Sequence, residues 1–307
     1  MILALLLAAL ASSPVVPAAE ATGFDILHSR IDALQPSRRH AVSGLVVSVD
    51  RAASAVVVSH DPIPDVMEAM TMAFEVRDAS ELDGIDIGDA VTFTLVLDDA
   101  RSWIEQVRER PYQPDNQDPV AASRLRMLSH ALAPERAARA VPVGQVVPDF
   151  TLVDQQTRPV RLSELRGRTV VVNFVYTSCA LPEFCYRVSN HFGVLKRRFA
   201  DALGSRLVLL TVTFDPVRDD PAALARYAEQ WQASPPGWHF LTGPEPDVQR
   251  ACDLFGVDAF PEEGLMNHNT RVAIIDADGR LVANLIGNRY TARQLGDLVE
   301  NVIPPTR

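Results

Sequence analysis

Residues 170–192, VVVNFVYTSCALPEFCYRVSNHF, decide the fold because a strand, two cysteines and a helix follow one another within them. The β-branched run at 170–172, continued by Phe174 and Val175, predicts a strand buried on both faces. Beyond the second cysteine, apolar residues recur at steps of four, three and four, which places them on one helix face; they are Val188, Phe192, Leu195 and Phe199. The thiols of Cys179 and Cys185 therefore lie where a buried strand gives way to a helix.

This position predicts the chemistry of the two thiols. Because helix N-termini favour negative charge, we expect the pKa of Cys179 and of Cys185 to lie below that of free cysteine. The spacing is Cys-x5-Cys, whereas the familiar redox pair is Cys-x-x-Cys. The alternative interpretation is a structural disulfide in an exported chain.

Composition limits the possible partners. A chain of 307 residues fits two domains, each with its own core. The net charge is -10, and Lys196 is the only lysine among 29 basic residues, which argues against nucleic acid and anionic membranes as partners. Three cysteines do not make a disulfide scaffold, and we expect the third, Cys252, to be a buried core residue.

The N-terminus has the pattern of an export signal. Residues 2–11 are apolar, and small residues and prolines follow them. Such a run is too short to span a bilayer and matches the hydrophobic region and cleavage zone of a secretory signal. We therefore predict a signal peptide over residues 1–21, no membrane span in the mature chain, and a periplasmic or secreted location.

From residue 41 the sequence is typical of short strands. The runs are AVSGLVVSVD, SAVVVSH, MTMAFEV, AVTFTLVLDD and RSWIEQVRE, separated by Gly, Asp and Pro. Four or five strands within about 70 residues predict a small antiparallel β-barrel of the OB type over residues 41–110.

Three of the six methionines lie close together in this region, shortly after His60; they are Met67, Met70 and Met72. If MTMAFEV is a strand, Met70 and Met72 share one face of it. Thioethers and an imidazole form a soft, neutral ligand set that prefers Cu(I). The alternative is that methionine simply fills the core of the barrel.

The same stretch resembles the periplasmic CusF-like copper-binding family, whose pattern is a His on one strand, an aromatic residue and then Met-x-Met. His60, Met70 and Met72 match that pattern. Met67 stands where the best-known members place a tryptophan over the metal, so the resemblance implies either a fourth ligand or a lid at this position.

Prolines with Asp and Asn between them mark a linker over residues 111–142, in which short helices are expected. Over residues 143–307, strand and helix patterns alternate and then close with the hairpin RVAIID-ADG-RLVANLI and a final helix. This order predicts an α/β thioredoxin-like sandwich of three layers.

In that architecture the loop entering the RVAIID strand faces the cysteine loop, and it contains His268. Two thiols and one imidazole suit copper in either oxidation state and are also compatible with zinc. Asp215 ends its strand at the same edge of the sheet. It is expected either to orient His268 or meet a partner, or to cap the following helix.

Three segments together resemble the Sco/SenC family of thioredoxin-fold copper carriers: GRTVVVNFVYTSC, LLTVTFDPVRDDPAAL and NHNTRVAIIDADGRLV. The resemblance covers about residues 143–303 and implies that Cys179, Cys185 and His268 are metal ligands. The family's usual spacing is Cys-x3-Cys with a proline beside each cysteine. Here two residues are inserted, and Ala180 and Tyr186 stand at the proline positions.

These observations predict an exported metallochaperone that carries copper, chiefly Cu(I), to the subunit bearing the CuA centre of cytochrome c oxidase during its assembly, or to another cuproprotein. One alternative is a thiol-disulfide oxidoreductase that acts on cysteines of a partner through a mixed disulfide. Another is copper sequestration without delivery. Copper transfer needs His268, whereas disulfide exchange does not.

Overall fold

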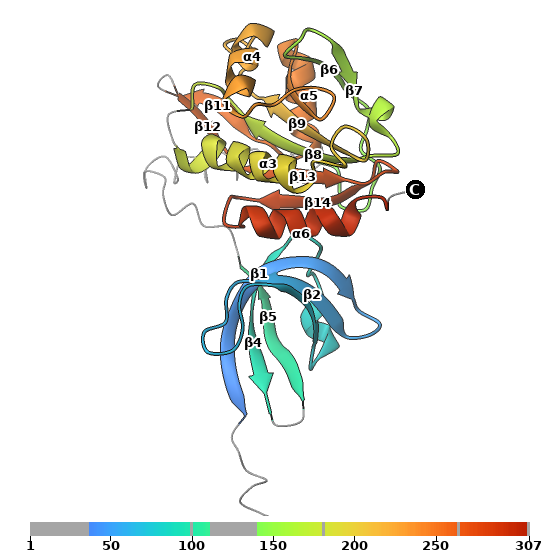
Figure 1. Cartoon of the computed structure of the whole chain (residues 1–307), viewed down its shortest axis with the longest axis vertical. Helices are drawn as coiled ribbons and strands as arrows, with labels where there is room; N and C mark the ends of the chain where they lie inside the picture. Colours follow the sequence, from blue (N-terminus) through green and yellow to red (C-terminus); the bar gives the residue numbers. More distant parts are fainter. Residues whose placement is uncertain (1–36, 99–100, 111–139, 180–181, 263–264, 306–307) are drawn as a thin grey trace, which may run out of the picture.

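The computed structural model describes residues 37–98, 101–110, 140–179, 182–262 and 265–305. The predicted signal peptide and nearly all of the predicted linker lie outside these residues. Figure 1 shows a β-sheet domain below, an α/β domain above and helix α6 (Ala292–Val302) between them. Within the described residues, no helix combines the length and the apolar character needed to cross a membrane.

The N-terminal domain is a five-stranded antiparallel sheet in the order β3-β2-β1-β4-β5. Its strands are β1 (Arg38–Asp50), β2 (Ala55–His60), β3 (Thr71–Glu75), β4 (Ala90–Leu97) and β5 (Ser102–Glu109). A buried apolar cluster that includes Val46, Val58 and Phe93 forms the core of this domain. The predicted short strands are therefore confirmed, whereas closure of the sheet into an OB-type barrel stays a prediction.

Gly44 allows β1 to approach β2 closely. A Cβ atom at this position would lie 2.5 Å from Cγ1 of Val58 and 2.8 Å from the carbonyl oxygen of Ser59. It would also lie 2.9 Å from Cα of His60, with which Gly44 is paired across the ladder. A glycine in a strand interior often marks such a close backbone approach.

The second domain is built on a seven-stranded sheet in the order β14-β13-β8-β9-β10-β6-β7. Its strands are β6 (Thr151–Asp154), β7 (Pro159–Arg161), β8 (Thr169–Val175), β9 (Leu207–Thr213), β10 (Trp238–Thr242), β13 (Arg271–Ile275) and β14 (Leu281–Ile286). Strands β8, β9 and β10 are parallel, and the other pairs are antiparallel. Every residue of β8 and of β9 is buried, as the apolar runs predict.

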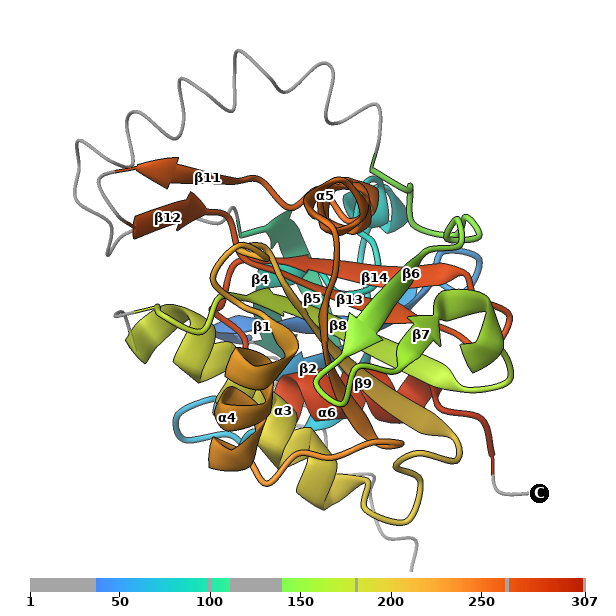
Figure 2. The same ribbon diagram turned by 90° about the horizontal axis from the view of Figure 1, so that it is seen from above.

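Helices cover both faces of this sheet. Figure 2 shows α5 (Glu245–Leu254) on one side and α3 (Arg187–Arg198), α4 (Pro221–Gln230) and α6 on the other. On the α5 side, the ring of Phe255 contacts that of Phe174 at a centroid distance of 5.6 Å. The predicted three-layer α/β arrangement is thus confirmed.

The segment around His268 differs from the expected loop. Two short strands, β11 (Ala259–Glu262) and β12 (Leu265–His268), pair antiparallel, and Ala259 pairs with His268. The sequence LMNH has neither alternating hydrophobicity nor β-branched residues, so its pattern does not indicate a strand. His268 therefore ends a strand rather than lying within a loop.

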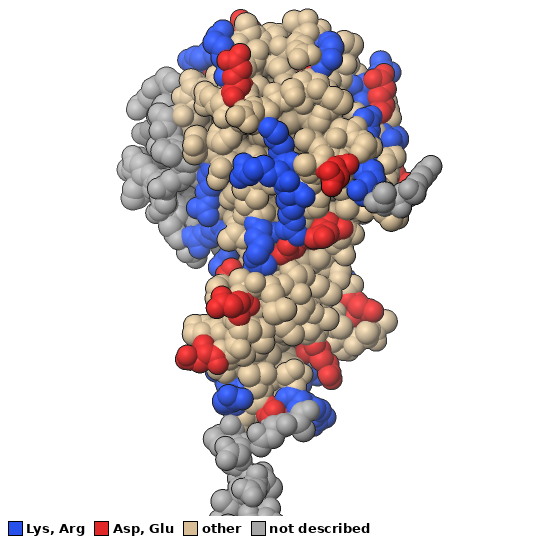
Figure 3. Space-filling model, in the orientation of Figure 1, with Lys and Arg blue, Asp and Glu red and all other residues tan. Residues whose placement is uncertain are grey.

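Charge is unevenly spread on the face shown in Figure 3, where Lys and Arg side chains gather over the middle of the molecule. Helix α3 contains no acidic residue, and its last turn carries Lys196, Arg197 and Arg198. Arg198 is paired with Asp297 and Glu300 of α6, which neutralises part of this cluster. The net charge alone does not reveal such a local concentration.

We predict that Gly44→Ala lowers the free energy of unfolding of the N-terminal domain by roughly 1–3 kcal/mol, because the added methyl group meets backbone atoms of β2. Denaturant unfolding combined with hydrogen exchange of the β1 and β2 amides measures the loss. Ser43→Ala, at the neighbouring position, is the control and should leave both values unchanged. Equal stability of the two variants would contradict this account of the close approach.

Candidate metal centre

Three predicted ligands meet at one edge of the seven-stranded sheet. Cys179 lies in the turn after β8, Cys185 lies in the π-helical turn Pro182–Tyr186 that leads into α3, and His268 ends β12. One ligand atom from each of these residues lies within 4.8 Å of the other two. A single ion of a soft metal could therefore contact two sulfurs and one nitrogen here. That these residues act as ligands stays a prediction.

The long spacing between the cysteines does not separate their sulfur atoms. The π-helical turn that carries Cys185 lies within the lengthened segment and continues directly into α3. A π turn takes up more residues than an α turn, and such turns are frequent at functional sites. Cys185 thus lies in a turn that leads into the helix, and the two thiols remain in hydrogen-bond contact.

The ring of His268 is held in one orientation. Its Nδ1 lies 2.9 Å from the carbonyl oxygen of Asn269, which can only accept a hydrogen bond. Nδ1 therefore carries the proton of the neutral ring, and Nε2 keeps its lone pair for a metal. The ring of Phe214 packs on the imidazole at a centroid distance of 4.7 Å, and those of Tyr176 and Phe184 stand edge-on to it.

The prediction of a lowered thiol pKa is wrong for Cys185. Its hydrogen bond with Cys179 raises the pKa, and burial of the side chain raises it further. These effects outweigh the helix N-terminus, because a negative charge beside a second sulfur in a buried position is costly. Cys179 and Cys185 are not joined by a disulfide in the structure.

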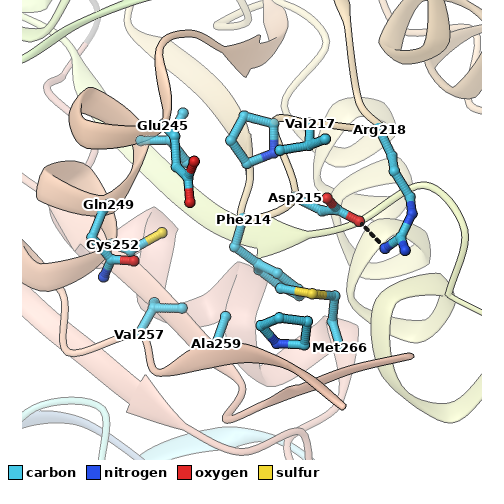
Figure 4. A pocket seen from close by; sticks show the side chains of 13 residues that line it. Phe214, Asp215, Val217, Arg218, Glu245, Gln249, Cys252, Val257, Ala259 and Met266 are labelled. Carbon is cyan, nitrogen blue, oxygen red and sulfur yellow. Dashed lines mark hydrogen bonds and ion pairs between the residues drawn. The ribbon is translucent and has the colours of Figure 1, made fainter. Parts of the chain in front are cut away.

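Cys252 is buried in α5, as predicted. Only 2% of its surface is exposed, and burial raises the pKa of its thiol to about 12. Its sulfur faces a cavity of about 280 Å³ that is also lined by Phe214, Asp215 and Met266 (Figure 4).

Asp215 has other contacts than those predicted. Its carboxylate accepts a hydrogen bond from Arg218 at 2.9 Å, and both residues lie at the rim of this cavity (Figure 4). The alternative role as a helix cap is wrong, since Asp220 caps α4 by accepting from the amide of Ala223. Asn269, rather than Asp215, accepts the hydrogen bond from Nδ1 of His268. A role of Asp215 toward the metal or a partner stays a prediction.

Two residues that support the cysteine loop were not predicted. Asp219 is fully buried and accepts hydrogen bonds from the amide and hydroxyl of Thr177 at 3.0 and 2.5 Å and from the hydroxyl of Thr213 at 2.6 Å. It thereby ties the start of the cysteine loop to the end of β9. Tyr176 is hydrogen-bonded to Cys179, and burial raises the pKa of its phenol. The segment DPVRDDP contains three aspartates, and its pattern does not show that Asp219 is the one that is fully buried.

The second predicted ligand group lies at one end of β2 and β3. The amide of His60 donates to the carbonyl oxygen of Met70 at 2.9 Å, and Met72 pairs with Val58 in the β2–β3 ladder. Because side chains alternate along a strand, His60, Met70 and Met72 share one face of this ladder. Met70 is 47% exposed, whereas Met67 and Met72 pack against the core of the domain.

His60 is oriented in the same way as His268. Its Nδ1 lies 2.7 Å from the carbonyl oxygen of Asp61, so Nε2 is the nitrogen without a proton. Nε2 is buried and has no hydrogen-bond partner. A bound ion is one way in which a buried polar atom without a partner can be satisfied.

Comparison with known proteins gives two family matches. A model described as SCO1/SenC matches residues 139–303, and one described as copper binding periplasmic protein CusF matches residues 39–109. The SCO1 protein homolog of Bacillus subtilis is 26% identical over 158 residues, which are 49% of this chain and 78% of the relative. The mitochondrial SCO2 homolog of Mus musculus is 28% identical over 174 residues, which are 54% of this chain and 65% of the relative. Among solved structures, copper-bound ScoI of Bradyrhizobium japonicum is 23% identical over 51% of this chain and 99% of its own, with a TM-score of 0.43.

We predict that iodoacetamide alkylates the three cysteines of the folded, metal-free chain in the order Cys179, Cys185, Cys252. Cys179 is partly exposed, whereas Cys185 and Cys252 are buried and have raised thiol pKa values, so their thiolate fraction at pH 8 is small. Peptide mass spectrometry at increasing times measures the three rates. In the denatured chain, which is the control, the rates should converge. Alkylation of Cys185 as fast as that of Cys179 in the folded chain would contradict the geometry described above.

Proposed function

Because the chain belongs to the SCO1/SenC family, we propose that it is an exported copper chaperone whose cargo is held by Cys179, Cys185 and His268. The observation that carries this proposal is the convergence of two sulfur atoms and one imidazole nitrogen within 4.8 Å, at the point where β8, α3 and β12 meet. Thiolate and imidazole ligands select copper over hard cations such as Mg²⁺.

The chemistry of the site suits both binding and release of a soft metal ion. Cys185 must lose its proton when it binds copper, and its raised pKa makes uptake stronger as the pH increases. The aromatic rings of Phe214 and Tyr176 shield Nε2 of His268 from water. Cys179 is the exposed side of the site, so a thiol or imidazole of a partner can reach the ion there and replace the ligands one at a time.

The recipient that we propose is the subunit carrying the CuA centre of cytochrome c oxidase, with another cuproprotein as the alternative. Membership of the family supports this proposal, together with a group of soft ligands, two thiols and an imidazole, at one edge of the domain. Zinc shares these ligand types, and competition between the two ions is part of the test below.

In the N-terminal domain, we propose that His60, Met70 and Met72 bind Cu(I), with Met67 as a fourth ligand or a lid. The CusF match over residues 39–109 and the buried, unpartnered Nε2 of His60 support this role. The proposal includes a periplasmic location after removal of residues 1–21, an OB-like closure of the first domain, and two functional units at residues 41–110 and 143–307.

A second candidate function is favoured by the hydrogen bond between the thiols of Cys179 and Cys185. In this reaction the thiolate of Cys179 attacks a disulfide of a partner and forms a mixed disulfide, and the partner's other sulfur leaves as a thiolate. The thiolate of Cys185 then displaces the partner. The partner's disulfide is reduced, and Cys179 and Cys185 become oxidised to a disulfide.

We predict that the full chain binds two Cu(I) ions tightly and that the two sites are lost separately. Cys179→Ser or His268→Ala should remove one ion, and Met70→Leu together with Met72→Leu should remove the other. Copper titration with intact-mass measurement counts the ions, and a parallel titration with Zn²⁺ tests selectivity. Cys252→Ser is the matched control and should bind both ions. Retention of both ions in His268→Ala would contradict the chaperone proposal.

The two candidate functions are separated by His268→Ala. We predict that this variant loses copper transfer to a CuA-domain acceptor while both cysteines remain available. Transfer is measured by the visible spectrum of the acceptor, and reduction of a disulfide acceptor is measured beside it. If His268→Ala bound and transferred copper normally, while Cys179→Ser abolished only disulfide reduction, the oxidoreductase function would be correct. Tight binding without any transfer would instead indicate sequestration.

A further inference from the structure

Helix α6 of the second domain holds the strands that carry the N-terminal ligands. It packs against β1 and β2, as Figure 1 shows. Three of its residues, Arg293, Gln294 and Asp297, form hydrogen bonds to the end of β2 and the start of β3. These bonds join the two domains at the place where His60 and Met70 lie side by side.

Asp297 bridges the two ligand-bearing strands with one oxygen atom. Its Oδ2 accepts a hydrogen bond from the hydroxyl of Ser59 at 2.6 Å and another from the hydroxyl of Thr71 at 2.7 Å. Ser59 and Thr71 pair across the β2–β3 ladder. Ser59 precedes His60, and Thr71 stands between the two methionines, so the anchored side chains alternate with the ligand side chains. One face of the ladder is therefore fixed to α6 while the other carries the ligands.

Arg293 holds the backbone of His60 itself. Its Nη2 donates to the carbonyl oxygen of His60 at 2.7 Å, and its Nη1 donates to the hydroxyl of Ser59 at 3.0 Å. The same Nη1 is 2.9 Å from Oδ2 of Asp297. Hydrogen bonds to charged groups are stronger than those between neutral groups. The guanidinium and the carboxylate thus fix both the position of β2 and the orientation of its last residue.

Gln294 contacts Asp61, the residue that orients the imidazole of His60. Its Nε2 donates to the carbonyl oxygen of Ser59 at 3.0 Å and to Oδ1 of Asp61 at 3.1 Å. The carbonyl oxygen of Asp61 in turn accepts the proton on Nδ1 of His60. The contact with α6 is therefore connected, through Asp61, to the tautomer of His60.

The part of this interface around Ser59, His60 and Gln294 is buried, and hydrogen bonds cross it. Ser59 and His60 are fully buried, and Gln294 is 3% exposed. Burial alone would raise the pKa of Asp297, but the hydrogen bonds from Ser59, Thr71 and Arg198 hold it below the usual value. The carboxylate of Asp297 is thus ionised at neutral pH. Salt screens its partly buried ion pair with Arg293 only weakly.

We propose that Arg293, Gln294 and Asp297 are positioning residues of the N-terminal copper site, so that a helix of the SCO1/SenC domain sets the affinity of the first domain for Cu(I). The inference rests on the proposed role of His60, Met70 and Met72 as ligands. Loss of groups that orient metal ligands typically weakens metal binding by about 10–100-fold. The two domains then act as one unit in which the first site is complete only while α6 is docked.

The test uses the full chain with Cys179→Ser and Cys185→Ser, so that only the N-terminal site binds Cu(I). Affinity is measured by competition with a chromophoric Cu(I) chelator. We predict that adding Asp297→Ala weakens binding about 10–100-fold and that Asp297→Asn, which keeps one acceptor oxygen, recovers part of the loss. Glu300→Ala is the matched control, because Glu300 lies on the same helix and pairs with Arg198 rather than with β2 or β3. Its affinity should equal that of the parent.

A second measurement separates positioning from loss of folding. In Gln294→Ala, nitrogen NMR of the imidazoles should show that His60 populates both tautomers, whereas His268 keeps the proton on Nδ1. Equal Cu(I) affinity of Asp297→Ala and the parent would overturn the proposal and leave the proposed function intact. If the parent itself bound no Cu(I), the proposed role of the N-terminal ligands would fail, and this inference with it.

Discussion

The antiparallel pairing of β8 with β13 is the constraint on which the candidate centre depends. Val272 pairs with Asn173, so the end of β8 lies beside the start of β13. The cysteine loop follows the end of β8, and His268 lies just before the start of β13. Residues that are far apart in the sequence therefore meet at one edge, and the parallel neighbour β9 adds Asp219 to the same edge to brace the loop.

Both domains prepare a histidine in the same way, although their folds are unrelated. In each case the ring donates its Nδ1 proton to the carbonyl oxygen of the next residue, Asp61 for His60 and Asn269 for His268. The other nitrogen keeps its lone pair. His268 lies beside the thiols of Cys179 and Cys185, and His60 lies on the ladder face that carries Met70 and Met72. Neutral thioethers suit capture of Cu(I), whereas titratable thiols make binding depend on pH. The two proposed sites therefore differ in how their binding of copper depends on pH.

Much of this architecture can be predicted from the sequence, because it depends on local patterns. The buried strand at 169–175, the apolar stripe of α3 and the short strands of the first domain all have clear periodicity. The position of His268 near the cysteines followed from the order of the elements. Other features depend on tertiary contacts that leave no local pattern. They include the raised pKa of Cys185, the pairing of β11 with β12, the buried position of Asp219 and the bonds from α6 to β2 and β3.

X-ray absorption at the copper edge tests the central claim most directly. The sample is the full chain carrying Met70→Leu and Met72→Leu and loaded with one equivalent of Cu(I), so that copper occupies only the second domain. The account predicts two sulfur neighbours from Cys179 and Cys185 and one imidazole nitrogen that disappears in His268→Ala. A spectrum with fewer than two sulfurs, or one that His268→Ala leaves unchanged, would contradict it.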